Sequence, residues 1–312
     1  MPTLFDFVPM LFSQQTHSQQ LKRRPEPTEL TEGEGAVADY NQVMATKLVE
    51  AYIAGLETVH RAQETIDAGN AIDLACGPGH YSLCLAKYLG YDEVLGVDLS
   101  APMIETASAN ADEVVENVRF EVGDVTELHG VPNDHFALSS FTDAAHHMPD
   151  LELVTRILRK MDQITRPDGL VMVMDLVRLR TEAVTERYVR TLGHDYIDRG
   201  LSDFFDDFRN SMYAAWTADE LRSAIPRDTR RTWCHIVPRG LPTIQFVLGL
   251  PVGRTTPFIR PGFGSNHPLV TDWYPRWQQQ VGTKWARETL TEWKMLKMSL
   301  RFGSTTLIPP AP

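Results

Sequence analysis

The sequence has few cysteines, and none of them are spaced as a pair. Its 312 residues contain Cys76, Cys84 and Cys234, which form no Cys-x-x-Cys motif. Such sparse cysteine use is typical of proteins kept reduced inside the cell, where structural disulfides are rare. We therefore expect a cytoplasmic protein without disulfide bonds.

Long apolar runs and long basic runs are also missing. No stretch approaches the roughly 18 consecutive apolar residues of a membrane-spanning helix. The apolar start, residues 1–12, has no basic leader and contains Asp6, so it does not resemble a secretion signal. The net formal charge is −11, and basic residues cluster only at 22–24. We expect neither a membrane nor a nucleic acid as partner.

What the sequence does contain is an apolar segment that runs into a glycine turn. Residues 71–80, Ala-Ile-Asp-Leu-Ala-Cys-Gly-Pro-Gly-His, predict a strand, a turn and the start of a helix. Gly77 and Gly79 let the backbone approach a ligand closely. A second short strand ends at Asp98, whose carboxylate can accept hydrogen bonds from two ribose hydroxyls. This βαβ unit predicts a ligand that carries an adenosine.

Two absences narrow the choice of adenosine ligand. A dinucleotide fingerprint needs a third glycine at position 82, which is Ser82, and no lysine-containing phosphate loop is present. A diphosphate is therefore not expected. The turn instead resembles that of the class I S-adenosylmethionine (SAM) dependent methyltransferases, which reads Asp/Glu-x-Gly-x-Gly-x-Gly. Asp73, Gly77 and Gly79 match this pattern, and Ala75 replaces the first glycine.

Later segments extend the resemblance over about residues 72–176. Residues 120–125 resemble the third strand, which in this family ends on an aspartate that contacts the adenine amino group. Residues 136–141 resemble the fourth strand, and they lead into Thr-Asp-Ala-Ala-His-His-Met-Pro-Asp at 142–150, similar to a His-His-x-Pro-Asp turn. Arg-Pro-Asp-Gly at 166–169 replaces the usual Lys-Pro-Gly-Gly before the fifth strand, 170–175.

The resemblance implies a fold, a cofactor and a set of binding residues. It implies an α/β protein with a Rossmann-like seven-stranded sheet and helices on both faces, and SAM as cofactor. The residues it assigns to cofactor binding are Asp73, Ala75, Gly77, Gly79, Asp98, Leu99, Met103, Asp124, Val125 and Ser140.

Composition and pattern divide the chain into five parts. These are a flexible N-terminal arm (1–35), the SAM-binding core (36–177), a helical insertion over the active site (178–216), the completion of the core sheet (217–250) and an aromatic-rich C-terminal extension (251–312). The arm is rich in Gln, Ser, Pro and Glu from residue 13 onward, without apolar periodicity. One helix is predicted from Asp39 to about Gln63. The arm and the extension are candidate surfaces for a homodimer.

His146, His147 and Tyr196 are the candidate catalytic residues. Methyl transfer to oxygen or to a protonated amine needs a base, and the histidine pair would lie at the mouth of the sheet. Asp143 and His194 are further candidates for the base, whereas a thioether acceptor needs none. The alternative interpretation is that the histidines only pack against the sheet.

No metal site is predicted. The histidines together with Asp143 and Asp150 offer suitable ligand atoms, but their spacing fits no i, i+4 ligand pair on a helix, and no cysteine cluster supports a zinc site.

The sequence therefore predicts a SAM-dependent methyltransferase that acts on an N, S or O atom of a small metabolite, such as an amino-acid-like compound; methionine S-methylation is one example. Acceptor choice is assigned to the aromatic insertion, through Tyr196 or Phe205. The alternatives are a protein or RNA methyltransferase and a SAM-binding regulatory protein without transfer activity.

Overall fold

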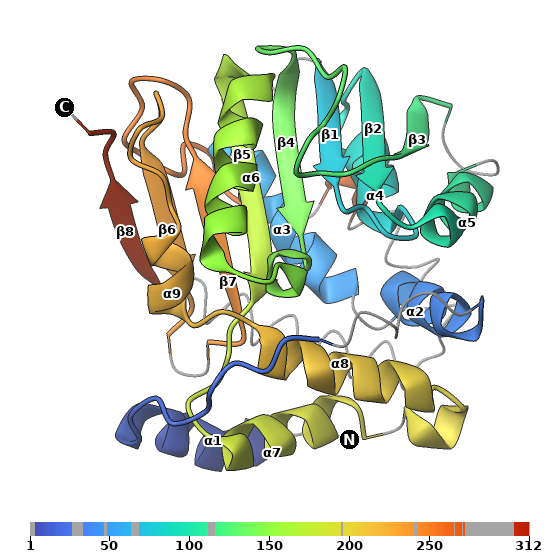
Figure 1. The fold of residues 1–312 in the computed structure, drawn as a ribbon, viewed down its shortest axis with the longest axis vertical. Helices are drawn as coiled ribbons and strands as arrows, with labels where there is room; N and C mark the ends of the chain where they lie inside the picture. The colour runs from blue at the N-terminus through green and yellow to red at the C-terminus, as the bar shows by residue number, and fades with distance from the viewer. Residues whose placement is uncertain are drawn as a thin grey trace.

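The computed structural model describes residues 4–26, 34–46, 49–63, 69–111, 116–194, 196–239, 242–264, 266–269, 271 and 303–311. Its strands are β1 (Asn70–Leu74), β2 (Glu93–Asp98), β3 (Val118–Val122), β4 (Phe136–Thr142), β5 (Thr165–Leu176), β6 (Trp233–Val237), β7 (Ile244–Gly249) and β8 (Ser304–Ile308). They form one sheet in the order β3-β2-β1-β4-β5-β7-β6-β8 (Figure 1). The strands from β3 to β5 are parallel, and the pairs β5–β7, β7–β6 and β6–β8 are antiparallel.

The described helices are α1 (Leu4–Thr16), α2 (Glu34–Thr46), α3 (Val49–Ala62), α4 (His80–Leu89), α5 (Ala101–Ala111), α6 (Leu151–Ile164), α7 (Glu182–Leu192), α8 (Ser202–Ala214) and α9 (Ala218–Ser223), with short 3-10 turns η1 (Ala145–His147) and η2 (Ile197–Arg199). Helices α3 and α4 pack on one face of the sheet, and α6 and α9 pack on the other. Successive residues of a strand point to opposite faces of the sheet, as Ala71 and Ile72 do. Because helices cover both faces, the inner strands carry apolar side chains on both faces. The prediction of an α/β fold with helices on both faces is confirmed.

The sheet has one strand more than predicted. Strand β8, from the C-terminal extension, pairs with β6 and covers what would otherwise be an open sheet edge. Its side chains are mostly exposed, so its sequence lacks the apolar character of the inner strands. The aromatic residues that marked the extension in the sequence, Trp273, Tyr274, Trp277, Trp285 and Trp293, lie outside the described residues.

The prediction of a flexible arm is wrong for residues 4–26. Helix α1 packs against α7, and its Phe7 and Met10 are buried there. Residues 18–26, which we call the strap, continue along α7 and α8; the backbone amide of Leu21 donates to Arg180 O at 3.0 Å. Apolar side chains of the N-terminal segment thus dock on this chain's own helices. The single helix predicted from Asp39 to Gln63 is instead two helices, α2 and α3.

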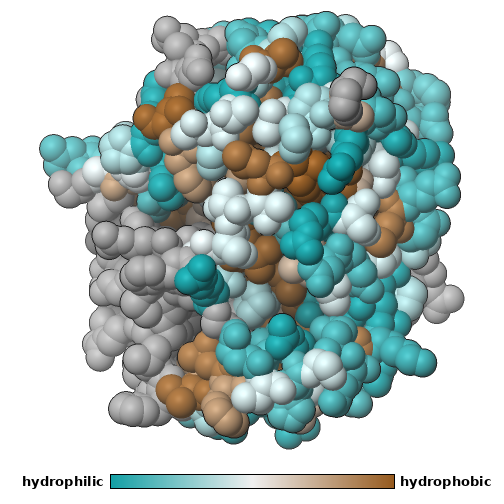
Figure 2. Space-filling view, turned by 90° about the vertical axis from the view of Figure 1, so that its left-hand side faces the viewer, coloured by the Kyte–Doolittle hydropathy of each residue, from teal (hydrophilic) through white to brown (hydrophobic). Residues whose placement is uncertain are grey.

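Helices α1, α7 and α8 form a layer beyond the carboxyl ends of the parallel strands (Figure 1). The helices α7 and α8 come from residues predicted as an insertion over the active site. On the face drawn in Figure 2, apolar areas are interrupted by polar side chains. No helix in the part of the chain that the structure describes is long and apolar enough to cross a membrane.

Candidate active site

The glycine turn lies at the carboxyl end of β1. The backbone has φ values of +52° at Gly77 and +79° at Gly79, a region that favours glycine. A Cβ at Gly79 would lie 2.5 Å from the Phe120 ring, so side-chain packing also requires glycine there. Ala75, which replaces the family's first glycine, has φ +53°. Ala75 therefore adopts a left-handed backbone conformation that costs energy for any residue with a Cβ.

Asp98 closes the turn from the end of β2. Its Oδ2 accepts the Gly77 amide at 2.8 Å and its Oδ1 accepts the Ser100 amide at 2.9 Å. A carboxylate offers about four acceptor positions, so two remain for hydroxyl groups of a ligand. Asp98 is only half-buried. It can therefore hold the turn and contact a ribose at the same time.

Asp73 and Ser140 support the turn from within the core. Asp73 is fully buried and accepts hydrogen bonds from Ser82 Oγ at 2.7 Å and Ser140 Oγ at 2.8 Å. Burial raises the pKa of Asp73 to about 6, although both hydroxyls lower it. Ser82, which occupies the place of a dinucleotide glycine, thus anchors the family aspartate.

The remaining cofactor candidates line the ends of β2 and β3. Leu99 is 72% exposed and offers apolar surface beside Asp98, whereas Met103 and Val125 are buried. Asp124 is exposed, and its Oδ1 accepts the Thr126 amide at 2.8 Å. Hydrogen bonds from the Thr126 side chain and from this amide lower the pKa of Asp124. The cofactor contacts assigned to these four residues stay predictions.

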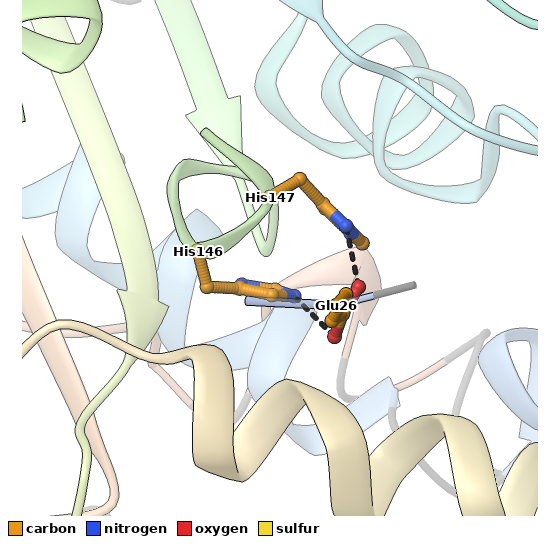
Figure 3. A group of neighbouring side chains, drawn as sticks. All are labelled: Glu26, His146 and His147. Atoms are coloured by element: carbon orange, nitrogen blue, oxygen red, sulfur yellow. Dashed lines mark ion pairs between the residues drawn. The ribbon is translucent and has the colours of Figure 1, made fainter. Parts of the chain in front are cut away.

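The histidine turn follows β4 and brings two imidazoles beside carboxylates. His146 is buried, and its Nδ1 lies 2.6 Å from Asp175 Oδ1 at the end of β5. His147 Nδ1 lies 2.6 Å from Oε2 of Glu26, the last described residue of the strap (Figure 3). Burial lowers the pKa of His146, but the charges of Asp175 and Glu26 outweigh it and raise that pKa to about 9. His146 is therefore an imidazolium at neutral pH when no other cation is bound.

Asp143 has a strained backbone and lies half-buried among charged groups. It directly follows β4 with φ +50°, and its amide donates to Met174 O at 2.8 Å. Burial, and then the charge of Asp175, raise the pKa of Asp143 to about 7. Strained backbone of this kind often accompanies function.

Helices α2 and α8 cover this edge of the sheet. The Tyr40 ring is the nearest group to a Cβ built at Gly77, at 3.7 Å, and it contacts Phe204 of α8 at a centroid distance of 5.8 Å. Asn41 Oδ1 lies 2.6 Å from His80 Nε2 at the start of α4. Burial raises the pKa of Asp207 on α8 to about 6, and the charge of Glu26 adds to the effect.

Tyr196 lies in the core of the helical layer. It is 1% exposed, and its ring meets Phe204 edge-on at 5.3 Å. A Cβ at Gly193 would lie 2.7 Å from the Phe205 ring, which shows how closely Phe205 packs there. His194 is exposed, with Nδ1 3.2 Å from Thr191 O. The contacts described for Tyr196 do not join it to the histidine turn, so its catalytic role stays a prediction.

Four residues of this site were not found from the sequence: Glu26, Tyr40, Asp175 and Asp207. Asp175 ends a predicted strand, and that position was the one available signal. Glu26 lies between two prolines in a polar segment without periodicity. Tyr40 and Asp207 lie on helices whose aromatic and acidic residues suggest either packing or a solvated face.

Comparisons with known proteins agree with this geometry. Residues 71–169 match the methyltransferase domain family. Uncharacterized methyltransferase YcgJ of Bacillus subtilis is 35% identical over 105 residues, which is 33% of this chain and 39% of that protein. Trans-aconitate 2-methyltransferase of Deinococcus radiodurans is 35% identical over 102 residues, 33% of this chain and 36% of that protein. Ubiquinone/menaquinone biosynthesis C-methyltransferase UbiE of Bdellovibrio bacteriovorus is 32% identical over 104 residues, covering 33% and 43%. The chain thus spans less than half the length of these relatives.

One solved structure shows the same fold. It is a chain of the complex between the Haloferax volcanii Trm112 methyltransferase activator and a methyltransferase, with a TM-score of 0.50 and 16% identity. The likeness covers 73% of this chain and 99% of that one.

Proposed function

We propose that this chain, which belongs to the class I SAM-dependent methyltransferase family, transfers the methyl group of SAM to a small amino-bearing metabolite. The observation that carries the proposal is the shared position of two groups. Asp98 and the glycine turn lie at the carboxyl ends of β1 and β2, and Asp143 and the histidine turn lie at the carboxyl ends of β4 and β5. Ligands of open α/β sheets bind at this edge.

The residues present fit SAM. A Cβ at Gly77 would meet only the Tyr40 ring within 4 Å among the described residues, so the turn leaves room for a ligand. Asp98 would bind the ribose hydroxyls, and the exposed Leu99 would pack against the adenine. Bound SAM supplies an electrophilic methyl group on a positively charged sulfur.

The acceptor side is rich in carboxylates. The charges of Glu26, Asp143 and Asp175 raise the pKa of His146, and the charge of Glu26 also raises the pKa of Asp207. A polycarboxylate acceptor would be repelled here, whereas a protonated amine would be attracted. The aromatic contact of α2 with α8 closes over the site and favours a small acceptor. These features support an amine or amino-acid-like metabolite.

Asp143 is the base that we propose for an amine acceptor. A pKa of about 7 lets its carboxylate accept a proton at neutral pH. When no cation is bound, His146 already holds a proton under these conditions, so it would orient groups through hydrogen bonds. A thioether acceptor such as methionine would need no base.

The test is to find the metabolite with which the purified chain converts SAM to S-adenosylhomocysteine. We expect turnover with a member of a panel of amines and amino acids, methionine included, and a product heavier by one methyl group. Turnover only with protein or RNA would contradict the small-molecule proposal. SAM binding without any turnover would favour a regulatory role.

A variant pair separates binding from chemistry. Asp98→Ala should weaken SAM binding by about 1–3 kcal/mol, because hydrogen bonds to a charged group are lost. Asp92→Ala, at an exposed position at the other end of β2, is the matched control. Calorimetry that gives both variants wild-type affinity would remove Asp98 from the cofactor site.

A further inference from the structure

Glu26, His146 and His147 bring one carboxylate and two imidazoles to a single point (Figure 3). One ligand atom from each lies within 4.8 Å of the other two. We propose that these three side chains bind a divalent first-row transition-metal ion. Two imidazole nitrogens with one carboxylate oxygen form a ligand set that suits Zn²⁺, Fe²⁺ or Co²⁺.

One of the two observed separations suits such an ion, and the other, an ion pair at 2.6 Å, would lengthen when the ion binds. His147 Nδ1 lies 2.6 Å from Glu26 Oε2, and His146 Nε2 lies 3.8 Å from Glu26 Oε1. Ligands bound at about 2.0–2.2 Å lie roughly 3 to 4 Å from one another. Small rotations of the side chains would therefore bring all three atoms into one coordination sphere.

Asp175 supplies the supporting contact that metal-binding histidines usually have. Its Oδ1 lies 2.6 Å from Nδ1 of His146, and it also accepts the amide of Leu176 at 2.8 Å. A carboxylate on one ring nitrogen fixes the orientation of the imidazole and makes the other nitrogen a better ligand. Here the other nitrogen, Nε2, is the one that faces Glu26.

A buried oxygen without a hydrogen-bond partner gives an independent reason for a cation. Glu26 Oε1 has no such partner among the described residues, although the side chain is only 9% exposed. His146 Nε2 lies 3.8 Å from this oxygen, which is too long for a hydrogen bond. Leaving a charged oxygen in this state is costly. A metal ion between the two atoms would satisfy it.

Arg23 fixes the strap to the histidine turn, so the ligands are held before an ion arrives. Its guanidinium donates to His146 O and Met148 O, each at 2.7 Å, and to Pro149 O at 3.1 Å. The same group lies 3.7 Å over the Trp216 ring. Glu26, three residues farther along, is thereby placed beside the imidazoles.

The ion is tested directly, on the full chain without a polyhistidine tag and after treatment with a chelator. Titration with Co²⁺, followed by its visible absorption, and with Zn²⁺, followed by calorimetry, should show one ion bound per chain. Mg²⁺ at millimolar concentration should not compete, since it prefers oxygen ligands. Absence of stoichiometric binding, or displacement by Mg²⁺, would overturn the proposal and leave the cluster as an ion pair.

Variants locate the ion. Glu26→Gln and His147→Ala should each weaken Zn²⁺ binding by about tenfold or more, and Asp175→Asn should do so by about 10–100-fold. The controls are Glu105→Gln, on the exposed face of α5, and His135→Ala, at the amino end of β4. Wild-type affinity in Glu26→Gln and in His147→Ala would contradict the assignment.

Folding and function are controlled separately. Unchanged SAM affinity shows that a variant has folded, because the glycine turn is not part of the cluster. Metal binding is measured without SAM or acceptor, so its failure would not affect the proposed methyl transfer. With three protein ligands, the ion would keep positions for water or an acceptor oxygen.

Discussion

The glycine turn and the histidine turn lie at the same edge of the sheet but are held in different ways. Most bonds of the glycine turn are local: Asp98 accepts from Gly77, 21 residues away, and Ser82 donates to Asp73, nine residues away; the bond from Ser140 to Asp73, 67 residues apart, is the exception. The histidine turn instead depends on the strap, since Arg23 and His146 are 123 residues apart in the sequence. The cofactor side is thus encoded mostly within one segment, whereas the acceptor side is assembled from distant ones.

This difference explains how one family serves many acceptors. The match to the methyltransferase domain family covers residues 71–169, a region that contains the glycine turn and the histidines but neither Glu26 nor α8. Segments outside that region can change without disturbing the bonds of the glycine turn. The acceptor side is therefore free to diverge.

The largest effect on the stability of the fold is expected from adding a side chain in the glycine turn. Gly79→Ala should destabilise the fold by about 3 kcal/mol, from a positive φ and an overlap with Phe120. Gly200→Ala is the matched control: its φ is +78°, with nothing within 4 Å among the described residues, so only about 1 kcal/mol is expected. Urea denaturation measures both. Equal losses would show that the packing against Phe120 does not matter.

Removing the contacts that hold the strap should affect the acceptor side of the site and leave the glycine turn intact. Arg23→Gln should cost about 2 kcal/mol, because it removes charged hydrogen bonds to buried carbonyls, and it should lower turnover while SAM affinity stays within a factor of a few. Arg24→Gln, whose partner Glu182 is exposed, should cost less than about 0.5 kcal/mol. A large drop in SAM affinity for Arg23→Gln would refute the independence of the two sides.

The same contrast decides what the sequence could predict. The glycine turn was predictable because most of its bonds join residues within one βαβ unit, where strand pattern and spacing fix the geometry. Even within this unit, one contact could not be predicted. The identity of Ser82 argued against a dinucleotide, but its hydrogen bond to Asp73 forms only because α4 packs on β1. Apolar periodicity likewise predicted the inner strands.

Long-range contacts could not be predicted in this way. Nothing in Pro-Glu-Pro at 25–27 indicates that Glu26 meets two histidines, because the strap has no periodicity and its position depends on α7 and α8. Strand β8 was missed for a similar reason: it is an exposed edge strand, so burial does not shape its sequence. The burial of Phe7 and Met10 against this chain's own helices could not be predicted, because their partners lie in the insertion.

A pH series tests the charges of the acceptor side. The folded pKa of Asp143 is about 7 and its unfolded pKa is about 4, so ionisation favours the unfolded chain. Stability is therefore lost as pH rises through this window. Asp143→Asn should remove the loss and stabilise the fold at pH 8 relative to wild type, with no gain at pH 4.

The substitution keeps the backbone conformation, because Asn tolerates positive φ well. Asp168→Asn, at an exposed site, is the control and should show no such pH dependence. Denaturation curves at both pH values give the comparison. A gain that is the same at pH 4 and pH 8 would mean that the charge of Asp143 is not the cause.

The smallest effect should come from restoring the family glycine. Ala75 keeps φ +53°, which costs an alanine about 1–2 kcal/mol, while glycine loses about 0.4–1 kcal/mol more chain entropy on folding. Ala75→Gly should therefore stabilise the fold by about 0.5 kcal/mol. Ala183→Gly, at an exposed position in helix α7, should have the opposite sign. Thermal melts of the two variants test the sign of each effect. If both variants are destabilised, the packing of the Ala75 methyl group stabilises the fold by more than the strained backbone of Ala75 destabilises it.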